Sequence, residues 1–286
     1  MHPFADAAAL SAWSARLAAL FTLASLGCGV YFIFRRSERL FRHALRFLGT
    51  AAALQAAAFA ALTAFYWGEP ANRFLAPLNT PHGLALALGF CVSGLLLWLE
   101  TRRATGVTFV FVLPWSLAVL LPPAFGAPPE LARFAGSAAS PLAAAHNLLF
   151  IVSYAMFING FGASCALLLA DRELRTHKYH EAAFSLPPVG EMDKLIWRLA
   201  AAGFPFFVAG FLLASGQLYA KYGRLPGSDV KEVGALATLA VYTVYLFLRR
   251  FGDWRGTKAA WANVAGFALV AATLLLSGRI SQYHRF

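Results

Sequence analysis

The chain of 286 residues is 59% hydrophobic and only 13% charged, with a mean hydropathy of +0.62. This composition excludes an ordinary soluble domain, because a soluble core of that length needs far less apolar surface, and it predicts an integral membrane protein. The formal net charge of +11 does not indicate nucleic-acid binding, since the basic residues form short clusters between apolar runs. The cysteines, Cys28, Cys91 and Cys165, lie inside those runs without CxxC or CxxCH spacing, and we interpret them as small buried hydrophobes.

Eight apolar runs are long enough to cross about 30 Å of hydrocarbon as helices. They lie near residues 10–34, 43–66, 82–100, 107–124, 142–170, 195–219, 233–250 and 259–279. The first run follows an acidic leader and is too long for a signal-peptide core, so we take it as a retained span. The sequence therefore predicts an all-α, polytopic transmembrane bundle that forms a single integral membrane domain over residues 1–286. An alternative for the run interrupted by Pro114 is a re-entrant segment.

Every second connection between these runs is basic. The basic clusters lie at residues 35–46, 102–103, 171–178 and 249–258. The alternate connections before the sixth run hold one arginine each, Arg73 and Arg133. By the positive-inside rule, the basic connections face the cytoplasm, whereas both termini and the connection at residues 220–232 face outward. We interpret the longest inner connection, residues 171–194, as a plain loop, with an amphipathic surface segment or a partner-docking site as alternatives. The predicted location is the inner membrane of a bacterium.

A polar interruption at residues 219–232 separates the sixth and seventh runs. Gly223, Pro226 and Gly227 are poorly suited to a helix interior, so the segment is predicted to be a loop at the membrane surface. Asp229 and Glu232 lie at the N-terminal end of the next span. Carboxylates stabilise a helix N-terminus, so we expect both residues to cap this span.

Aromatic side chains stand at the start of this loop. Tyr219 and Tyr222 form an aromatic platform for a flat ligand in one interpretation and anchor the helix end in the interface in the other.

Three histidines, His82, His146 and His284, are placed at the outer ends of spans in this topology. Neutral imidazole is a good ligand for haem iron, and two histidines from different helices can bind it from both axial sides. We choose His146 and His284 as the candidate pair, and the alternative for each is an interfacial anchor or cap. His82 is a spare candidate for which we expect capping or positioning of the third span. His43 is interpreted as part of a basic inner rim.

No Ser/His/Asp arrangement, metal cluster or phosphate-binding loop is visible in the sequence. The residues therefore favour a binding protein without catalytic residues over an enzyme.

A fixed order of residues runs from about residue 142 to the end of the chain. It comprises His146, Ser153 to Phe157, Leu186 to Lys194, Arg198, Gly203 and Phe204, Tyr242, Tyr245, Arg249, Asp253 to Ala260, Gly266 and Phe267, and His284. This order resembles the cytochrome c assembly superfamily of CcsA-, CcmC- and HemX-like membrane proteins, and Asn79-Thr80 with Leu113-Pro114 resemble its HemX-like branch. The resemblance covers a family core at residues 142–286.

In the haem-delivering members of that superfamily the outer loop carries the motif WGxxWxWDPKE. The same register here reads Tyr222-Gly-Arg-Leu-Pro-Gly-Ser-Asp-Val-Lys-Glu232. Gly223, Asp229, Lys231 and Glu232 are kept, and the three tryptophan positions hold Tyr222, Pro226 and Ser228. The flat aromatic surface of the motif is therefore largely absent from this chain.

The resemblance implies haem handling in cytochrome c biogenesis, with non-covalently bound haem b and with His146 and His284 as axial ligands. Arg224 or Lys231 would then pair with the haem propionates, and Tyr222, Asp229 and His82 complete the implied cofactor contacts. The implied partners are membrane lipid, haem and another cytochrome c biogenesis protein or membrane complex. The chain would be at most part of a haem-delivery or haem-lyase system.

Two rival functions stay open. A structural or regulatory membrane subunit would have a decayed haem site and a basic inner face, at residues 171–198 and 249–258, that binds a partner. A transporter for haem or another hydrophobic anion would need an internal polar path. The polar residues inside the spans are isolated: Gln55, Asn159, Gln217 and Asn263.

Overall fold

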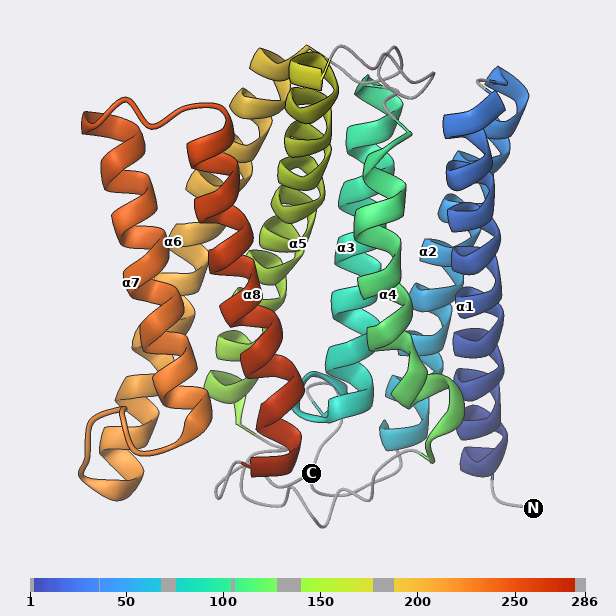
Figure 1. Cartoon of the computed structure of the whole chain (residues 1–286). Helices are drawn as coiled ribbons and strands as arrows, with labels where there is room; N and C mark the ends of the chain where they lie inside the picture. The colour runs from blue at the N-terminus through green and yellow to red at the C-terminus, as the bar shows by residue number, and fades with distance from the viewer. Residues whose placement is uncertain are drawn as a thin grey trace. The chain divides into compact units, whose positions relative to one another are not determined.

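The computed structural model describes residues 3–35, 37–67, 76–103, 106–127, 140–176 and 188–280, with the surroundings of side chains 3–5, 103, 176 and 275–280 excepted. The described residues form eight α-helices and one short 3-10 helix, without a strand among them (Figure 1). The all-α class is therefore confirmed. The predicted positions Arg73, Arg133 and His284 lie outside the described residues.

Each α-helix coincides with one predicted apolar run, and the ends differ by at most seven residues. The helices are α1 (Pro3–Arg35), α2 (Glu38–Trp67), η1 (Pro77–Asn79), α3 (Pro81–Arg103), α4 (Thr108–Phe125), α5 (Pro141–Thr176), α6 (Val189–Tyr222), α7 (Val230–Phe251) and α8 (Thr257–Ile280). Within the described residues, the seven helices α1 to α7 are long and apolar enough to span a membrane. α8 matches the eighth predicted run. α4 continues unbroken through Pro114, which favours a span over a re-entrant segment.

The chain divides into two compact units, Met1–Ile151 and Val152–Phe286, and the boundary falls inside α5. The family core at residues 142–286 stays a prediction. The single membrane domain and the outward placement of both termini stay predictions.

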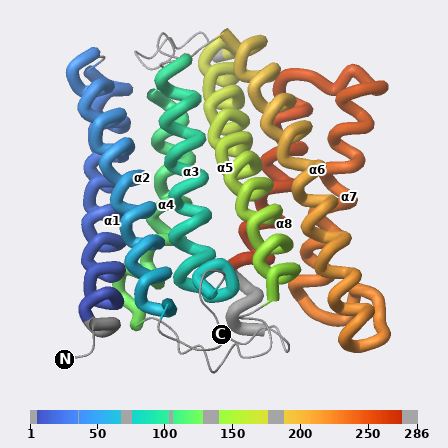
Figure 2. Tube along the Cα trace, turned by 180° about the vertical axis from the view of Figure 1, so that it is seen from behind, coloured from blue at the N-terminus to red at the C-terminus, as the bar shows by residue number. Residues whose placement is uncertain are grey.

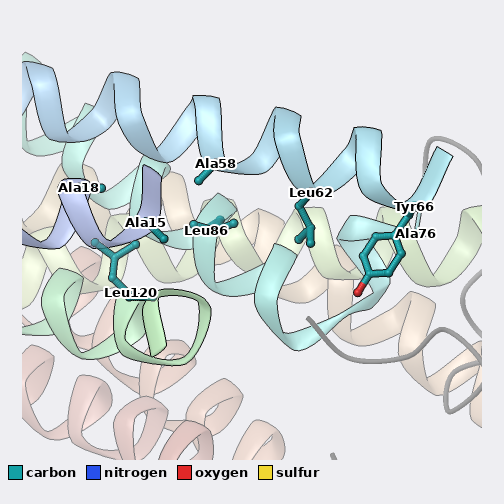
Figure 3. Packing of buried hydrophobic residues seen from close by; sticks show 9 residues of the cluster. Ala15, Ala18, Ala58, Leu62, Tyr66, Ala76, Leu86 and Leu120 are labelled. Carbon is teal, nitrogen blue, oxygen red and sulfur yellow. The ribbon is translucent and has the colours of Figure 1, made fainter. Parts of the chain in front are cut away.

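The first unit packs α1 to α4 with small side chains at the helix contacts. One cluster of its core is drawn in Figure 3 and contains Ala15, Ala18, Ala58, Leu62, Tyr66, Ala76, Leu86, Leu120 and Ala124. Alanine lets helix backbones approach closely, which favours association in a membrane. The hydroxyl groups of Ser11 and Ser25 on α1 donate to the carbonyls of Ala58 and Ala44 on α2, at 2.8 and 2.9 Å. These bonds join α1 and α2 at two levels.

A buried polar chain joins α2, α3 and α4. Gln55 Nε2 donates to Ser93 Oγ at 3.4 Å, and Ser93 Oγ lies 3.1 Å from Ser116 Oγ. Interhelical hydrogen bonds of this kind stabilise packed membrane helices. Gln55, isolated in the sequence, therefore has a structural contact in the first unit.

In the second unit, aromatic rings pack against glycines. Tyr242 on α7 stacks on Phe157 of α5, with ring centroids 3.9 Å apart and an interplanar angle of 9°. A Cβ atom on Gly266 of α8 would lie only 2.9 Å from Tyr242 Cε2, so this position has no room for a side chain. Asn263 Nδ2 donates to Ser164 Oγ at 3.0 Å and links α8 to α5. Asn263 is thus part of the helix packing.

Candidate functional site

The α6–α7 loop, residues 223–229, is described throughout and begins with a glycine cap. Gly223 has φ +66° in the left-handed region, and its N–H donates to the Tyr219 carbonyl at 2.8 Å. Glycine adopts this conformation without a Cβ clash and commonly ends helices in this way. Gly227 follows with φ +146°. The predicted loop, with Gly223, Pro226 and Gly227 outside the helices, is confirmed (Figure 1).

A capping box closes the other end of the loop. Asp229 has extended backbone angles, and its Oδ1 accepts from the Lys231 N–H at 2.9 Å. Glu232 Oε2 accepts from the Asp229 N–H at 3.3 Å, which completes the reciprocal arrangement. The predicted capping of α7 by Asp229 and Glu232 is therefore confirmed. The same Glu232 oxygen also accepts from the Gly227 and Ser228 N–H groups, at 2.8 and 2.9 Å.

Arg224 forms a bidentate ion pair with Glu232 across this loop. Nη1 donates to Oε2 at 2.9 Å and Nη2 donates to Oε1 at 2.8 Å, with the side chains 24% and 11% exposed. Paired bonds of this geometry are the strong form of an arginine–carboxylate contact. The carboxylate of Glu232 thus accepts hydrogen bonds from the Arg224 guanidinium and from three backbone N–H groups. These bonds connect the two ends of the loop. The sequence reasoning missed this pair, for which the eight-residue separation gives no local signal.

The aromatic side chains beside the loop point outward. Tyr219 and Tyr222 are 61% and 47% exposed, and Lys221 Nζ lies 5.3 Å from the centroid of the Tyr222 ring. Leu225 is also exposed. Such a surface suits both interpretations of these tyrosines, an aromatic platform and an interfacial anchor.

His146 lies in the first unit, on the second turn of α5. Its half-buried ring meets the Phe150 ring edge-on, with centroids 4.7 Å apart. The neighbouring Asn147 Nδ2 donates to the Leu78 carbonyl at 2.9 Å and to Asn79 Oδ1 at 3.3 Å. Asn147 therefore holds the start of α5 against η1, which fixes the height at which His146 is presented. The sequence reasoning had given Asn147 no role.

His82 lies on the first turn of α3, but it is not the cap of that helix. Thr80 Oγ1 accepts from the Gly83 N–H at 3.3 Å and takes that role. Both ring nitrogens of His82 are shielded from solvent. A Cβ atom on Gly126 would lie 3.1 Å from His82 Nε2, so the ring packs beside the end of α4. Of the two roles expected for His82, positioning is the one this packing fits.

The structure does not bring the proposed pair together, because His284 lies outside the described residues. Among the residues that are described, no group of three or more His, Cys, Asp or Glu side chains is arranged to hold a metal ion. His146 and His284 as axial ligands therefore remain a prediction.

A second arginine–carboxylate pair lies beside the turn between α7 and α8, and Figure 1 shows this turn at the opposite end of the second unit from the α6–α7 loop. Arg249, near the end of α7, donates from both terminal nitrogens to the two carboxylate oxygens of Asp193 on α6. Arg249 also donates to the Trp254 carbonyl at 2.7 Å, and the Gly256 N–H donates to Asp193 at 2.8 Å. The network joins α6, α7 and the turn before α8. The sequence analysis did not predict this link between three segments.

A scan against family models matches residues 13–283 to the family described as "Cytochrome C assembly protein". Protein HemX from Bacillus subtilis (strain 168) is 26% identical over 157 residues, which cover 55% of this chain and 57% of that protein. The cytochrome c biogenesis protein CcsA of Chlamydomonas reinhardtii is 31% identical over 208 residues, 68% of this chain and 56% of that protein. The CcsA protein of Thermosynechococcus vestitus is 36% identical over 81 residues, 28% of this chain and 25% of that protein.

The matched regions thus span little more than half the length of the first two relatives. No solved structure matches this chain.

Proposed function

This chain belongs to the cytochrome c assembly family, and from that premise we propose that it binds and handles haem during cytochrome c biogenesis. It would do so at the outer face of a bacterial inner membrane, as a multi-pass protein that binds haem without catalysing a reaction of its own. Where a larger haem-delivery or haem-lyase system exists, this chain would be one component of it.

The observation that carries the proposal is the ordered α6–α7 loop. Four residues that match the family's loop motif have defined positions there: Gly223 ends α6, Asp229 and Glu232 cap α7, and Lys231 donates its N–H to the cap. A loop that is already fixed loses little conformational freedom when a ligand binds beside it. This supports a binding surface next to Tyr222.

The donor set fits haem in its chemistry. His146 offers a neutral imidazole beside Phe150, in a position that Asn147 fixes, and His284 would supply the second imidazole. Haem b, if bound, would supply an iron that the imidazole nitrogens of His146 and His284 would hold. Tyr222 would offer its exposed ring to the macrocycle. Arg224 already shares its guanidinium with Glu232, so a propionate would have to compete with that ion pair, and Lys231 is the other candidate partner for a propionate.

The test is the reduced-minus-oxidised absorption spectrum and the pyridine haemochrome of the detergent-purified protein. We expect a stoichiometric b-type spectrum that is lost in His146→Ala and in His284→Ala. His43→Ala is the matched control, because His43 is exposed on the second turn of α2 and stacks only on Phe47. His82→Ala tests whether the shielded His82 ring contributes. Purified protein that stays free of haem after haem is supplied would contradict the proposal.

The second candidate function is a structural or regulatory membrane subunit. The closed Arg224–Glu232 pair favours it, because the loop satisfies its own charges and offers no unpaired guanidinium to a carboxylate ligand. A haem-free protein that co-purifies stoichiometrically with another cytochrome c biogenesis protein is the expected outcome under this alternative.

A further inference from the structure

The arginines of this protein differ in whether they have a carboxylate partner. Arg224 and Arg249 each bind a carboxylate through both terminal nitrogens of the guanidinium. Arg39, Arg42 and Arg46 on α2 form no salt bridge with any residue that the structure describes, and all three side chains are exposed.

The three unpaired arginines lie on one face of α2. Residues three and four positions apart share a helix face, and this spacing separates Arg39 from Arg42 and Arg42 from Arg46. The opposite face carries the buried residues Phe41, Ala44 and Leu48, and the Ala44 carbonyl accepts the hydrogen bond from Ser25 on α1. The arginine face therefore points away from the first unit, toward whatever surrounds the protein.

The height of this face along the helix identifies its surroundings. Trp67 ends α2 and is 58% exposed, as expected for a residue at the membrane–water interface. At 1.5 Å per residue, Arg46 lies about 32 Å from Trp67 along the axis, close to the ~30 Å thickness of the hydrocarbon. Arg39 lies about 10 Å beyond Arg46. The three guanidinium groups thus cover the depth of one headgroup layer.

The same face continues into the hydrocarbon as a smooth surface. Between Thr50 and Trp67 the exposed positions of α2 are Ala53, Ala56, Ala57, Ala60 and Ala64. Alanine side chains leave a shallow strip along which an acyl chain can lie, on the same helix face as the arginines. Figure 2 shows the course of α2 as a Cα trace. A cationic headgroup zone above an acyl-sized strip has the chemistry of an anionic phospholipid.

We propose that Arg39, Arg42 and Arg46 with the alanine strip of α2 form a binding site for an anionic phospholipid, whose phosphate pairs with the guanidinium groups. Arginine suits this role because its planar fork matches phosphate oxygens. Arg35, exposed at the adjoining end of α1, adds a fourth positive charge. The site is independent of haem and of the α6–α7 loop.

The test uses the full-length protein in bilayers of phosphatidylcholine that contain phosphatidylglycerol, with spin-labelled versions of both lipids as probes. We expect the labelled phosphatidylglycerol to be immobilised on the protein with a preference of roughly five-fold or more over phosphatidylcholine, the scale of one or more surface arginines. The preference should fall toward one in R39Q/R42Q/R46Q and should persist in R39K/R42K/R46K, which keeps the charges.

The control is R250Q/R255Q/K258Q, which removes three exposed positive charges from the second unit. It should retain the preference. Equal losses in the two glutamine variants would overturn the proposal in favour of a general effect of net charge. A wild-type preference in R39Q/R42Q/R46Q would overturn it as well, provided that gel filtration shows the variant to be folded.

Discussion

The two arginine–carboxylate pairs of the second unit differ in what they connect. Arg224 and Glu232 are eight residues apart and close one loop, whereas Arg249 and Asp193 are 56 residues apart and join α6 to α7 and to the turn before α8. The Arg249 and Asp193 side chains are only 9% and 11% exposed. A local pair stiffens a segment that is already held by its neighbours in sequence. A long-range pair fixes the arrangement of whole helices, so its loss should affect the entire unit.

The largest effect is expected for Asp193→Ala. Removal of one partner from a buried pair leaves Arg249 uncompensated and costs about 3–5 kcal/mol. Thermal unfolding of the detergent-solubilised protein should show a strongly lowered midpoint. Arg255→Ala is the matched control, because its pair with Asp253 is exposed on both sides, and it should change little. An unchanged midpoint for Asp193→Ala would show that the network does not hold the unit together.

Lysine replacements sharpen the comparison at constant charge. Arg249→Lys loses the paired geometry and its bond to the Trp254 carbonyl, with an expected cost of roughly 1–3 kcal/mol. Arg224→Lys, at a more exposed and local pair, should cost less than Arg249→Lys in the same unfolding measurement. The opposite order would mean that the loop, and not the helix junction, limits the stability of the second unit.

Glu232→Gln should loosen the loop without unfolding the unit. The amide keeps one acceptor oxygen but loses the charge that binds Arg224, with a cost of roughly 1–2 kcal/mol. Hydrogen exchange of the Gly227 and Ser228 amides should accelerate, because Glu232 accepts from both. Exchange in α8 provides the internal reference, and acceleration there to the same extent would contradict a purely local role.

The smallest effect is expected for Asp229→Ala, which removes the side-chain cap of α7. Loss of an N-cap acceptor costs about 1 kcal/mol. The Lys231 amide should lose protection against hydrogen exchange, and Asp229→Ser, which restores an acceptor, should recover it. Failure of the serine variant to restore protection would argue that the carboxylate charge, and not the cap geometry, is what matters.

The positions of the helices could be predicted from sequence because a membrane span requires a long apolar run, and each run gave one helix. Gly223 and the caps Asp229 and Glu232 could also be predicted, since helix ends have local chemical signatures. The pairing of Asp193 with Arg249 could not be predicted. Asp193 stood out only by resemblance and Arg249 also as part of a basic cluster, and no local pattern indicates which distant charge a buried arginine meets.

The histidines show the same limit. Imidazole chemistry and position at a span end made His82 and His146 candidates, but their surroundings come from tertiary contacts. Thr80, two residues before His82, takes the capping role, and Asn147 links the start of α5 to η1 through a hydrogen bond to the Leu78 carbonyl. Neither contact follows any periodicity in the sequence.

The serine bonds between α1 and α2 also have a consequence for biosynthesis. Ser11 and Ser25 bond only to the next helix in the chain, and the connection between the two helices is short. Contacts between neighbouring segments form with little loss of chain entropy, and an emerging chain folds from its N-terminus onward. The α1–α2 pair is therefore expected to enter the bilayer as a helical hairpin while the rest of the protein is still being synthesised, and to provide the surface on which α3 and α4 assemble.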